Sequence, residues 1–145
     1  MDFLSSLNIS GSGLTAQKLR MDIISQNIAN AEVTRTENGS PYRRKMVVLS
    51  SIKDNGSFRD AFDRAAKGKT GGVQVERIIE DRSPFVPVYN PNHPDANEEG
   101  YVMLPNVNTA QEMIDMLGAS RAYEANVTAF NATKSMILKA LEIGR

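Results

Sequence analysis

The stretch of this sequence that most constrains its fold is residues 106–144, which contain no proline. Asn108 or Thr109 can cap the start of a helix there, and Gly144 suits its end. A helix from about Thr109 to Glu142 would be roughly 50 Å long at ~1.5 Å per residue, too long for the core of a compact chain this size. The apolar residues recur at steps of three, four and seven, which indicates one apolar face; they are Met113, Met116, Leu117, Tyr123, Val127, Phe130, Ile137, Leu138 and Leu141.

Proline placement divides the chain into three parts. All six prolines lie between Pro41 and Pro105, and both ends of the chain lack them. Because proline and glycine interrupt regular structure, we predict an N-terminal helical segment (residues 1–35), a small β-containing middle lobe (36–105) and a C-terminal helical segment (106–145). The predicted fold is mainly α. Its long terminal helices form an antiparallel, coiled-coil-like pair, and the β-containing lobe is inserted between them.

The N-terminal segment also has one apolar face at helical spacing, formed by Leu4, Leu7, Leu14, Met21, Ile24 and Ile28. Gly11 and Gly13 interrupt it, and each glycine costs up to ~1 kcal/mol in a helix interior. One interpretation is a helix that begins near Ser12. The other is a continuous helix whose glycines permit close contact with another helix. The second is favoured because Leu4 and Leu7 keep the helical phase across the glycines.

The middle lobe contains β-rich segments between turn residues. We predict strands over Tyr42–Ile52, Val73–Ile79, Phe85–Tyr89 and Tyr101–Leu104, and a short helix over Phe58–Lys67 after a turn at Asn55-Gly56. Pro84 and Pro87 place the third strand at a sheet edge. The basic cluster Arg43-Arg44-Lys45 could contact phosphates. The favoured interpretation is an exposed face, or an edge protected against aggregation.

Composition excludes several function classes. Lys+Arg and Asp+Glu are both 17, so the net charge is zero, which disfavours a general nucleic-acid or anionic-membrane binder. The absence of cysteine excludes disulfides, thiolate metal sites and a cysteine nucleophile. The N-terminus lacks the basic and apolar regions of a cleaved secretory signal, and no apolar run approaches the ~20 residues that span a bilayer. We therefore expect a soluble chain that, if exported, leaves without a cleaved signal.

Residues that could carry chemistry are scattered. His93 is the single histidine, and with Asp95 it could form an acid–base pair or bind metal, but a zinc site needs three or four clustered ligands. Glu98 and Glu99 are adjacent, so on an extended segment they point to opposite faces. The glycines at 68–72 lack the Gly-Lys-Ser/Thr ending of a phosphate loop. We predict no catalytic residue, no cofactor and no metal.

The two apolar faces are therefore the informative feature. A hairpin of two helices buries only one side of each, and the conformational entropy of ordering opposes it. An isolated pair should be marginally stable, and helices from neighbouring copies would stabilise it. Both chain ends contain many small and amide residues that allow close approach of further helices; they are Ala119, Ser120, Ala122, Ala125, Asn126, Thr128, Ala129, Asn131, Ala132 and Thr133, with Ser25, Gln26, Asn27, Ala29 and Asn30. This pattern predicts a polymer whose inner layer is built from both chain ends.

Several segments resemble those of a known family. Residues 12–17 (SGLTAQ), 20–21 (RM) and 24–30 (ISQNIAN) resemble the N-terminal signature of bacterial flagellar axial proteins, which form rod, hook and hook-associated structures. A second set is similar to the proximal rod proteins of the flagellar basal body: residues 41–43 (PYR), 100–108 (GYVMLPNVN), 112–113 (EM), 119–127 (ASRAYEANV) and 131–136 (NATKSM). The likeness covers nearly the whole chain.

The resemblance implies a structural subunit and not an enzyme. Such subunits are exported unfolded through the flagellar type III apparatus and assemble helically into a hollow drive shaft. The shaft crosses the periplasm and transmits motor torque. Terminal helices form the inner coiled-coil layer, and the middle lobe lies outside. The implied partners are other proximal and distal rod proteins, the rod–ring junction protein and the membrane ring, with no nucleic acid and no small-molecule substrate.

The residues expected to pack between subunits are the apolar ones of both helical faces: Leu7, Leu14, Met21, Ile24, Ile28, Met113, Leu117, Tyr123, Val127, Phe130, Ile137 and Leu141. Polar candidates for inter-subunit contacts are Arg20, Asn27, Asn30, Arg121, Asn126 and Asn131. Two other classes of function stay open. One is a small periplasmic binding module with His93, Asp95 and Tyr101 lining a pocket in the middle lobe. The other is a helical adaptor or export chaperone.

Overall fold

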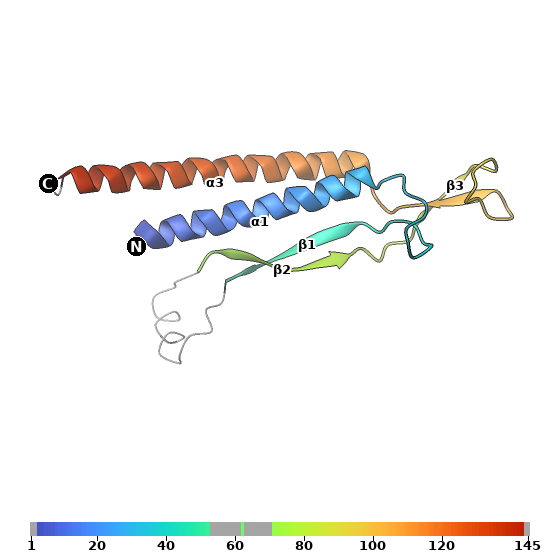
Figure 1. The fold of residues 1–145 in the computed structure, drawn as a ribbon, viewed down its shortest axis with the longest axis horizontal. Helices are drawn as coiled ribbons and strands as arrows, with labels where there is room; N and C mark the ends of the chain where they lie inside the picture. Colours follow the sequence, from blue (N-terminus) through green and yellow to red (C-terminus); the bar gives the residue numbers. More distant parts are fainter. Residues whose placement is uncertain (1–2, 53–61, 63–70, 144–145) are drawn as a thin grey trace. The chain divides into compact units, whose positions relative to one another are not determined.

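The computed structural model describes residues 3–52, 62 and 71–143. Apart from Phe62, the short helix predicted over Phe58–Lys67 lies outside the described residues, as do Asn55-Gly56 and Gly144. In chain order the elements are α1 (Phe3–Ala29), β1 (Lys45–Ser51), β2 (Val73–Glu80), β3 (Val86–Tyr89), β4 (Tyr101–Leu104) and α3 (Thr109–Ile143) (Figure 1). Two long helices with a small β region between them confirm the predicted fold class.

Helix α3 starts where the sequence predicted because Asn108 caps it. The Asn108 Oδ1 accepts hydrogen bonds from the backbone N–H groups of Ala110 and Gln111, at 3.1 and 3.3 Å. These two N–H groups have no partner inside the helix, so the side chain satisfies donors that would otherwise need water. The helix then runs for 35 residues without a break.

Helix α1 is continuous through Gly11 and Gly13, so the continuous helix of the second interpretation is confirmed. The two glycines have different surroundings. A Cβ added at Gly13 would lie 3.0 Å from the Asn126 Oδ1 of α3, whereas one at Gly11 would meet nothing within 4 Å. Gly13 therefore marks a close approach of the two helices. At the C-terminal end of α1, the Asn30 side chain donates to the Gln26 carbonyl at 2.7 Å and closes the last turn.

The strands form two separate two-stranded sheets, β1 with β2 and β3 with β4. In the second sheet the strands are antiparallel, and Tyr89 is opposite Tyr101 while Val86 is opposite Leu104. With only two strands, every strand is an edge, as predicted for Phe85–Tyr89. Strand β4 spans the predicted residues Tyr101–Leu104.

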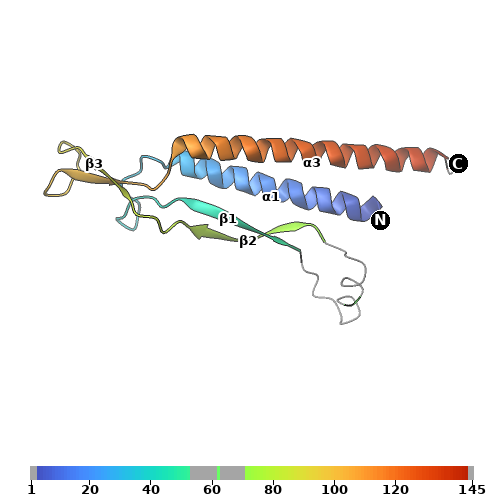
Figure 2. The ribbon, with the colours of Figure 1, turned by 180° about the vertical axis from the view of Figure 1, so that it is seen from behind.

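The chain forms two compact units. The first contains residues 1–19, 48–77 and 120–145, and the second contains residues 20–47 and 78–119. In each unit a segment of α1 lies beside a segment of α3 that runs in the opposite direction (Figures 1 and 2). Fully covered apolar side chains are few among the described residues. Ala16 is covered in the first unit, and Ile23, Ile24, Tyr42, Val102 and Ala119 are covered in the second.

Candidate assembly faces and the polar cluster

A cluster of buried polar side chains holds the second unit together, and Asn27 is at its centre. Asn27 is only 1% exposed. Its Nδ2 donates to the Lys45 carbonyl at 2.8 Å and to the Glu112 Oε2 at 2.9 Å. Its Oδ1 accepts from the Tyr42 hydroxyl at 3.0 Å and from the Lys45 N–H at 2.9 Å. The amide therefore uses two donors and two acceptor positions within its own chain.

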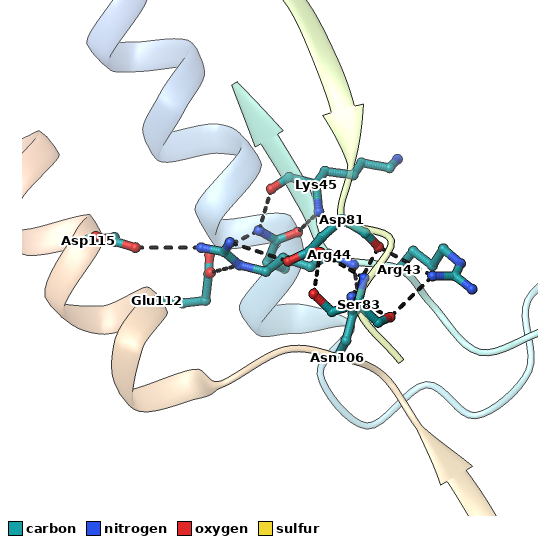
Figure 3. A network of polar contacts seen from close by, with 9 residues as sticks. Arg43, Arg44, Lys45, Asp81, Ser83, Asn106, Glu112 and Asp115 are labelled. Atoms are coloured by element: carbon teal, nitrogen blue, oxygen red, sulfur yellow. Dashed lines mark hydrogen bonds and ion pairs between the residues drawn. The ribbon is translucent and has the colours of Figure 1, made fainter. Parts of the chain in front are cut away.

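Glu112 supplies the buried negative charge of this cluster (Figure 3). Its carboxylate is 1% exposed and accepts a hydrogen bond from the Arg44 Nε at 2.6 Å. The Arg44 guanidinium also lies 3.6 Å from Asp115 and 3.9 Å from Asp81. A carboxylate buried this deeply is tolerated only when it is paired and hydrogen-bonded. Glu112, in the first turn of α3, thus connects that helix to both α1 and the residue before β1.

Asn106 and Arg43 extend the cluster to the segment after β2 (Figure 3). The Asn106 Oδ1 accepts from the Arg44 N–H at 3.0 Å, and its Nδ2 donates to the Asp81 carbonyl at 3.1 Å. Arg43 donates to the carbonyls of Asp81 and Ser83 at 3.3 and 3.4 Å. The guanidinium carbon of Arg43 lies 4.3 Å from the ring centre of Phe85, a cation–π contact.

Two side chains of this cluster have shifted pKa values. The Ser83 hydroxyl donates to the Asp81 carboxylate, and this bond, with the Ser83 N–H and the Arg44 and Arg43 charges, lowers the pKa of Asp81. Burial raises the pKa of Tyr42, and the nearby negative charges of Glu112 and Glu80 raise it further. Both shifts favour the protonation state that each group needs for its contacts here.

The favoured interpretation of Arg43-Arg44-Lys45 as an exposed face is wrong for Arg44. Its side chain is 23% exposed and ion-paired with Glu112. Glu112, the ion-pair partner of Arg44, lies 68 residues away in the sequence, so no local spacing connects the two residues. Glu112 lies in the predicted C-terminal helix, and nothing in the sequence marks Arg44 as its partner.

Both terminal helices carry solvent-exposed apolar side chains. In the second unit, Met113, Ile114 and Leu117 of α3 are 60%, 64% and 55% exposed. In the first unit, the exposed apolar residues near the chain ends are Leu4, Ile9, Met136, Leu138, Leu141 and Ile143. Exposed side chains of this size in neighbouring helical turns are typical of a surface that another molecule covers.

The predicted packing residues therefore differ in exposure. Ile24 is buried within the chain, while Met113, Leu117 and Leu141 are exposed. The others are half-buried: Leu7, Leu14, Met21, Ile28, Tyr123, Val127, Phe130 and Ile137. Among the polar candidates, Arg121 and Asn131 are exposed, Arg20, Asn30 and Asn126 are half-buried, and Asn27 is buried. Ile114, Met136 and Ile143 are exposed but were not among the predicted packing residues.

The alternative site in the middle lobe can be located as well. A cavity of about 390 Å³ is lined in part by Asp95 and Tyr101, but not by His93. The Asp95 carboxylate accepts from the Thr34 hydroxyl at 2.8 Å and lies 3.8 Å from Arg35. Within the described part of the chain, no three His, Cys, Asp or Glu residues converge as metal ligands. No helix among the described residues is long and apolar enough to cross a membrane.

Comparison with known proteins gives consistent matches at both chain ends and over the full length. Residues 7–35 match the model for flagella basal body rod proteins, and residues 98–143 match the model for the C-terminal part of the flagellar basal body rod FlgEFG proteins. The flagellar basal-body rod protein FlgC of Bacillus subtilis is 51% identical over the whole of both chains. The chain belongs to the FlgC family of flagellar basal-body rod proteins.

Other FlgC proteins are also similar over nearly their full length. The protein of Borreliella burgdorferi is 46% identical over 99% of this chain and 98% of its own. That of Escherichia coli O6:H1 is 40% identical over the whole of both chains. The resemblance drawn from the sequence signatures is thus confirmed. A member of the FlgC family is a structural subunit of the flagellar basal-body rod and not an enzyme.

Proposed function

We propose that this chain is a subunit of the proximal rod, and that it assembles helically through its two terminal helices into a hollow shaft that transmits motor torque. The observation that carries the proposal is the exposure of Met113, Leu117 and Leu141, each more than half exposed in the isolated chain. Burying one such side chain contributes roughly 1.5–3 kcal/mol. In the assembly, neighbouring subunits would cover these positions on every copy. The assembly would therefore be more stable than a single chain.

In the assembled shaft, residues 1–35 and 106–145 form the inner layer, and residues 36–105 form an outer lobe. Torque spreads over many small helix–helix contacts, so that no single contact carries the load. The half-buried apolar residues of α1 and α3 then become fully buried between subunits. Arg121 and Asn131, which are exposed in the free chain, supply polar contacts to a neighbour.

We place the assembled chain in the periplasmic part of the basal body, after export through the flagellar type III apparatus without cleavage of a signal. Its partners there are the other proximal and distal rod proteins, the rod–ring junction protein and the membrane ring. The neutral balance of charge, 17 basic and 17 acidic residues, fits packing among many protein neighbours better than binding to nucleic acid.

The proposal is tested with Leu117→Asp in a strain whose own rod protein has been deleted. Because Leu117 is 55% exposed, the substitution should leave the far-UV circular dichroism of the purified chain unchanged. It should nevertheless abolish rod assembly and swarming, since a carboxylate would be buried between subunits. Gln74→Glu, at an exposed position of β2, adds the same charge outside the helices and should preserve swarming. Normal swarming of the Leu117→Asp strain would contradict assembly through this face.

A further inference from the structure

The hairpin of β3 and β4, in the second unit, has two faces of different character. Its register pairs Tyr89 with Tyr101 and Pro87 with Met103, so these four side chains share one face. On the other face, Val102 of β4 is only 3% exposed, whereas Val86 and Val88 of β3 are 50% and 40% exposed. On the first face, Tyr89 is 63%, Tyr101 41% and Met103 45% exposed. The aromatic face is thus open on both strands, whereas the opposite face is covered at Val102 of β4.

The hairpin cannot easily recruit another strand at its edges. At the outer edge of β4, the Tyr101 N–H donates to the Asn97 Oδ1 at 2.8 Å, and the Tyr101 carbonyl accepts from the Asn97 N–H at 2.9 Å. Asn97 therefore occupies the outward backbone groups of Tyr101. On β3, Pro87 has no N–H to offer. Both features disfavour strand addition at the edges and favour binding to the face.

The open face presents a defined aromatic pair. The rings of Tyr89 and Tyr101 meet edge to face, with centroids 5.4 Å apart and planes at 68°. The Tyr89 ring lies against Gly100, where an added Cβ would be 2.9 Å from the Tyr89 Cε2. Gly100 also has a φ of +81°, a conformation that glycine adopts without strain. Both properties require glycine at this position, so the ring pair is held in place by the turn beneath it.

The same turn carries two carboxylates, Glu98 and Glu99, both exposed. The Asn97 Oδ1 accepts from the Glu99 N–H at 3.1 Å, which fixes the backbone beside the rings. Asp95, in the same loop, has Arg35 at 3.8 Å. Among the described residues no ion pair involves Glu98 or Glu99. The turn therefore leaves two negative charges without a cation next to an exposed aromatic pair.

We propose that this face, formed by Pro87, Tyr89, Tyr101 and Met103 with the acidic turn Glu98-Glu99, docks a basic segment of a different protein. An arginine of that segment stacks on the tyrosine rings while Glu98 and Glu99 neutralise the segment's charge. Exposed tyrosine pairs of this kind suit the centre of an interface, because they bury a large area at low entropic cost. A second copy meeting the same face would bring four carboxylates together, which opposes a symmetric contact.

The docking proposal rests on the proposed function only in placing the partner within the basal body. It is tested by replacing Tyr89 with photoreactive benzoylphenylalanine in the full chain, irradiating cells that have built basal bodies, and sequencing the crosslinked peptide. We expect a peptide of another protein, with a lysine or arginine within a few residues of the crosslink. The same probe at Ile78, exposed on β2, should not capture that peptide.

The charge requirement is tested by adding Glu98→Gln and Glu99→Gln to the probe strain. Two surface charges at the edge of an interface predict a fall in crosslink yield of about fivefold. An unchanged yield, a crosslinked peptide without a basic residue, a crosslink to a second copy, or no crosslink would each overturn the docking proposal. The presence of the chain in purified basal bodies is scored in the same cells. If the chain is present in basal bodies but gives no Tyr89 crosslink, the docking proposal alone is rejected. If the chain is absent from basal bodies, the proposed function is rejected as well.

Discussion

Replacing Glu112 with glutamine tests whether the polar cluster holds the second unit together. The substitution keeps the side-chain volume but removes the charge that faces the Arg44 Nε at 2.6 Å. It also turns one acceptor into an NH2 group that must face Arg44 or the Asn27 Nδ2, both of which are donors. One buried polar atom therefore loses its partner whichever way the new amide is oriented.

The expected loss of stability follows from these contacts. Breaking a buried ion pair costs about 3–5 kcal/mol when the remaining charge has no other partner. Arg44 keeps Asp115 at 3.6 Å and Asp81 at 3.9 Å, and its side chain is 23% exposed. We therefore expect a loss of about 2–3 kcal/mol, below the full penalty.

The assay is urea unfolding of the purified monomeric chain, followed by far-UV circular dichroism. With a urea dependence of roughly 1–3 kcal/mol/M, the midpoint should fall by about 1 M or more. Glu124→Gln, at an exposed position of the same helix, removes the same charge and should cost under about 0.5 kcal/mol. The double variant Arg44→Met with Glu112→Met should lose less than the sum of the single changes. A midpoint shift for Glu112→Gln no larger than that for Glu124→Gln would refute the reasoning.

Three further predictions concern single side chains. Ser83→Ala should raise the pKa of Asp81 toward its ordinary value, because it removes the hydroxyl donor, and carboxyl-carbon NMR should show this change. The lowered folded-state pKa of Asp81 gives stability that is present above the unfolded pKa of about 3.9 and is lost as pH falls through the folded pKa. Acid unfolding of the variant should therefore begin at higher pH. The pKa of Tyr42 is raised, so this side chain gives stability that is present below the unfolded pKa of about 10 and is lost as pH rises through the folded pKa. Absorbance at alkaline pH should show one tyrosine that ionises late. Tyr42→Phe should abolish this late ionisation, and Glu112→Gln should lower its pKa. Gly11→Ala should raise stability by about 0.5–1 kcal/mol. Gly13→Ala should gain less or lose stability, because its Cβ would meet Asn126 at 3.0 Å. Equal urea midpoints for the two variants would contradict a close helix approach at Gly13.

The helices and strands could be predicted because their signals are local. The periodic apolar residues, the Asn108 cap and the absence of proline gave α3 within a residue or two of Thr109–Ile143. Strand β4 was placed at its observed bounds because turn residues flank a short apolar run. For α1, glycine propensity alone would have favoured a helix that begins near Ser12. The helical phase of Leu4 and Leu7 instead indicated the continuous helix that is observed.

The polar cluster could not be predicted, since its members are distant in the sequence. Asn27 and Glu112 are 85 residues apart, and Arg44 and Glu112 are 68 apart. No spacing rule relates such positions, so Arg44 was interpreted as part of an exposed face. Likewise, the pairing of Tyr89 with Tyr101 depends on strand register, which is fixed by the turn that Asn97 and Gly100 build. The contacts between subunits stay predictions, because they depend on neighbouring chains.

The separation of Asn27 from Glu112 has a consequence for biosynthesis. The ribosome adds Asn27 to the chain long before Glu112. Until Glu112 is added, the Asn27 amide lacks the carboxylate to which its Nδ2 donates. The second unit therefore cannot close while the nascent chain is shorter than about three-quarters of its final length. During that interval the polypeptide remains open to any chaperone that recognises unfinished chains.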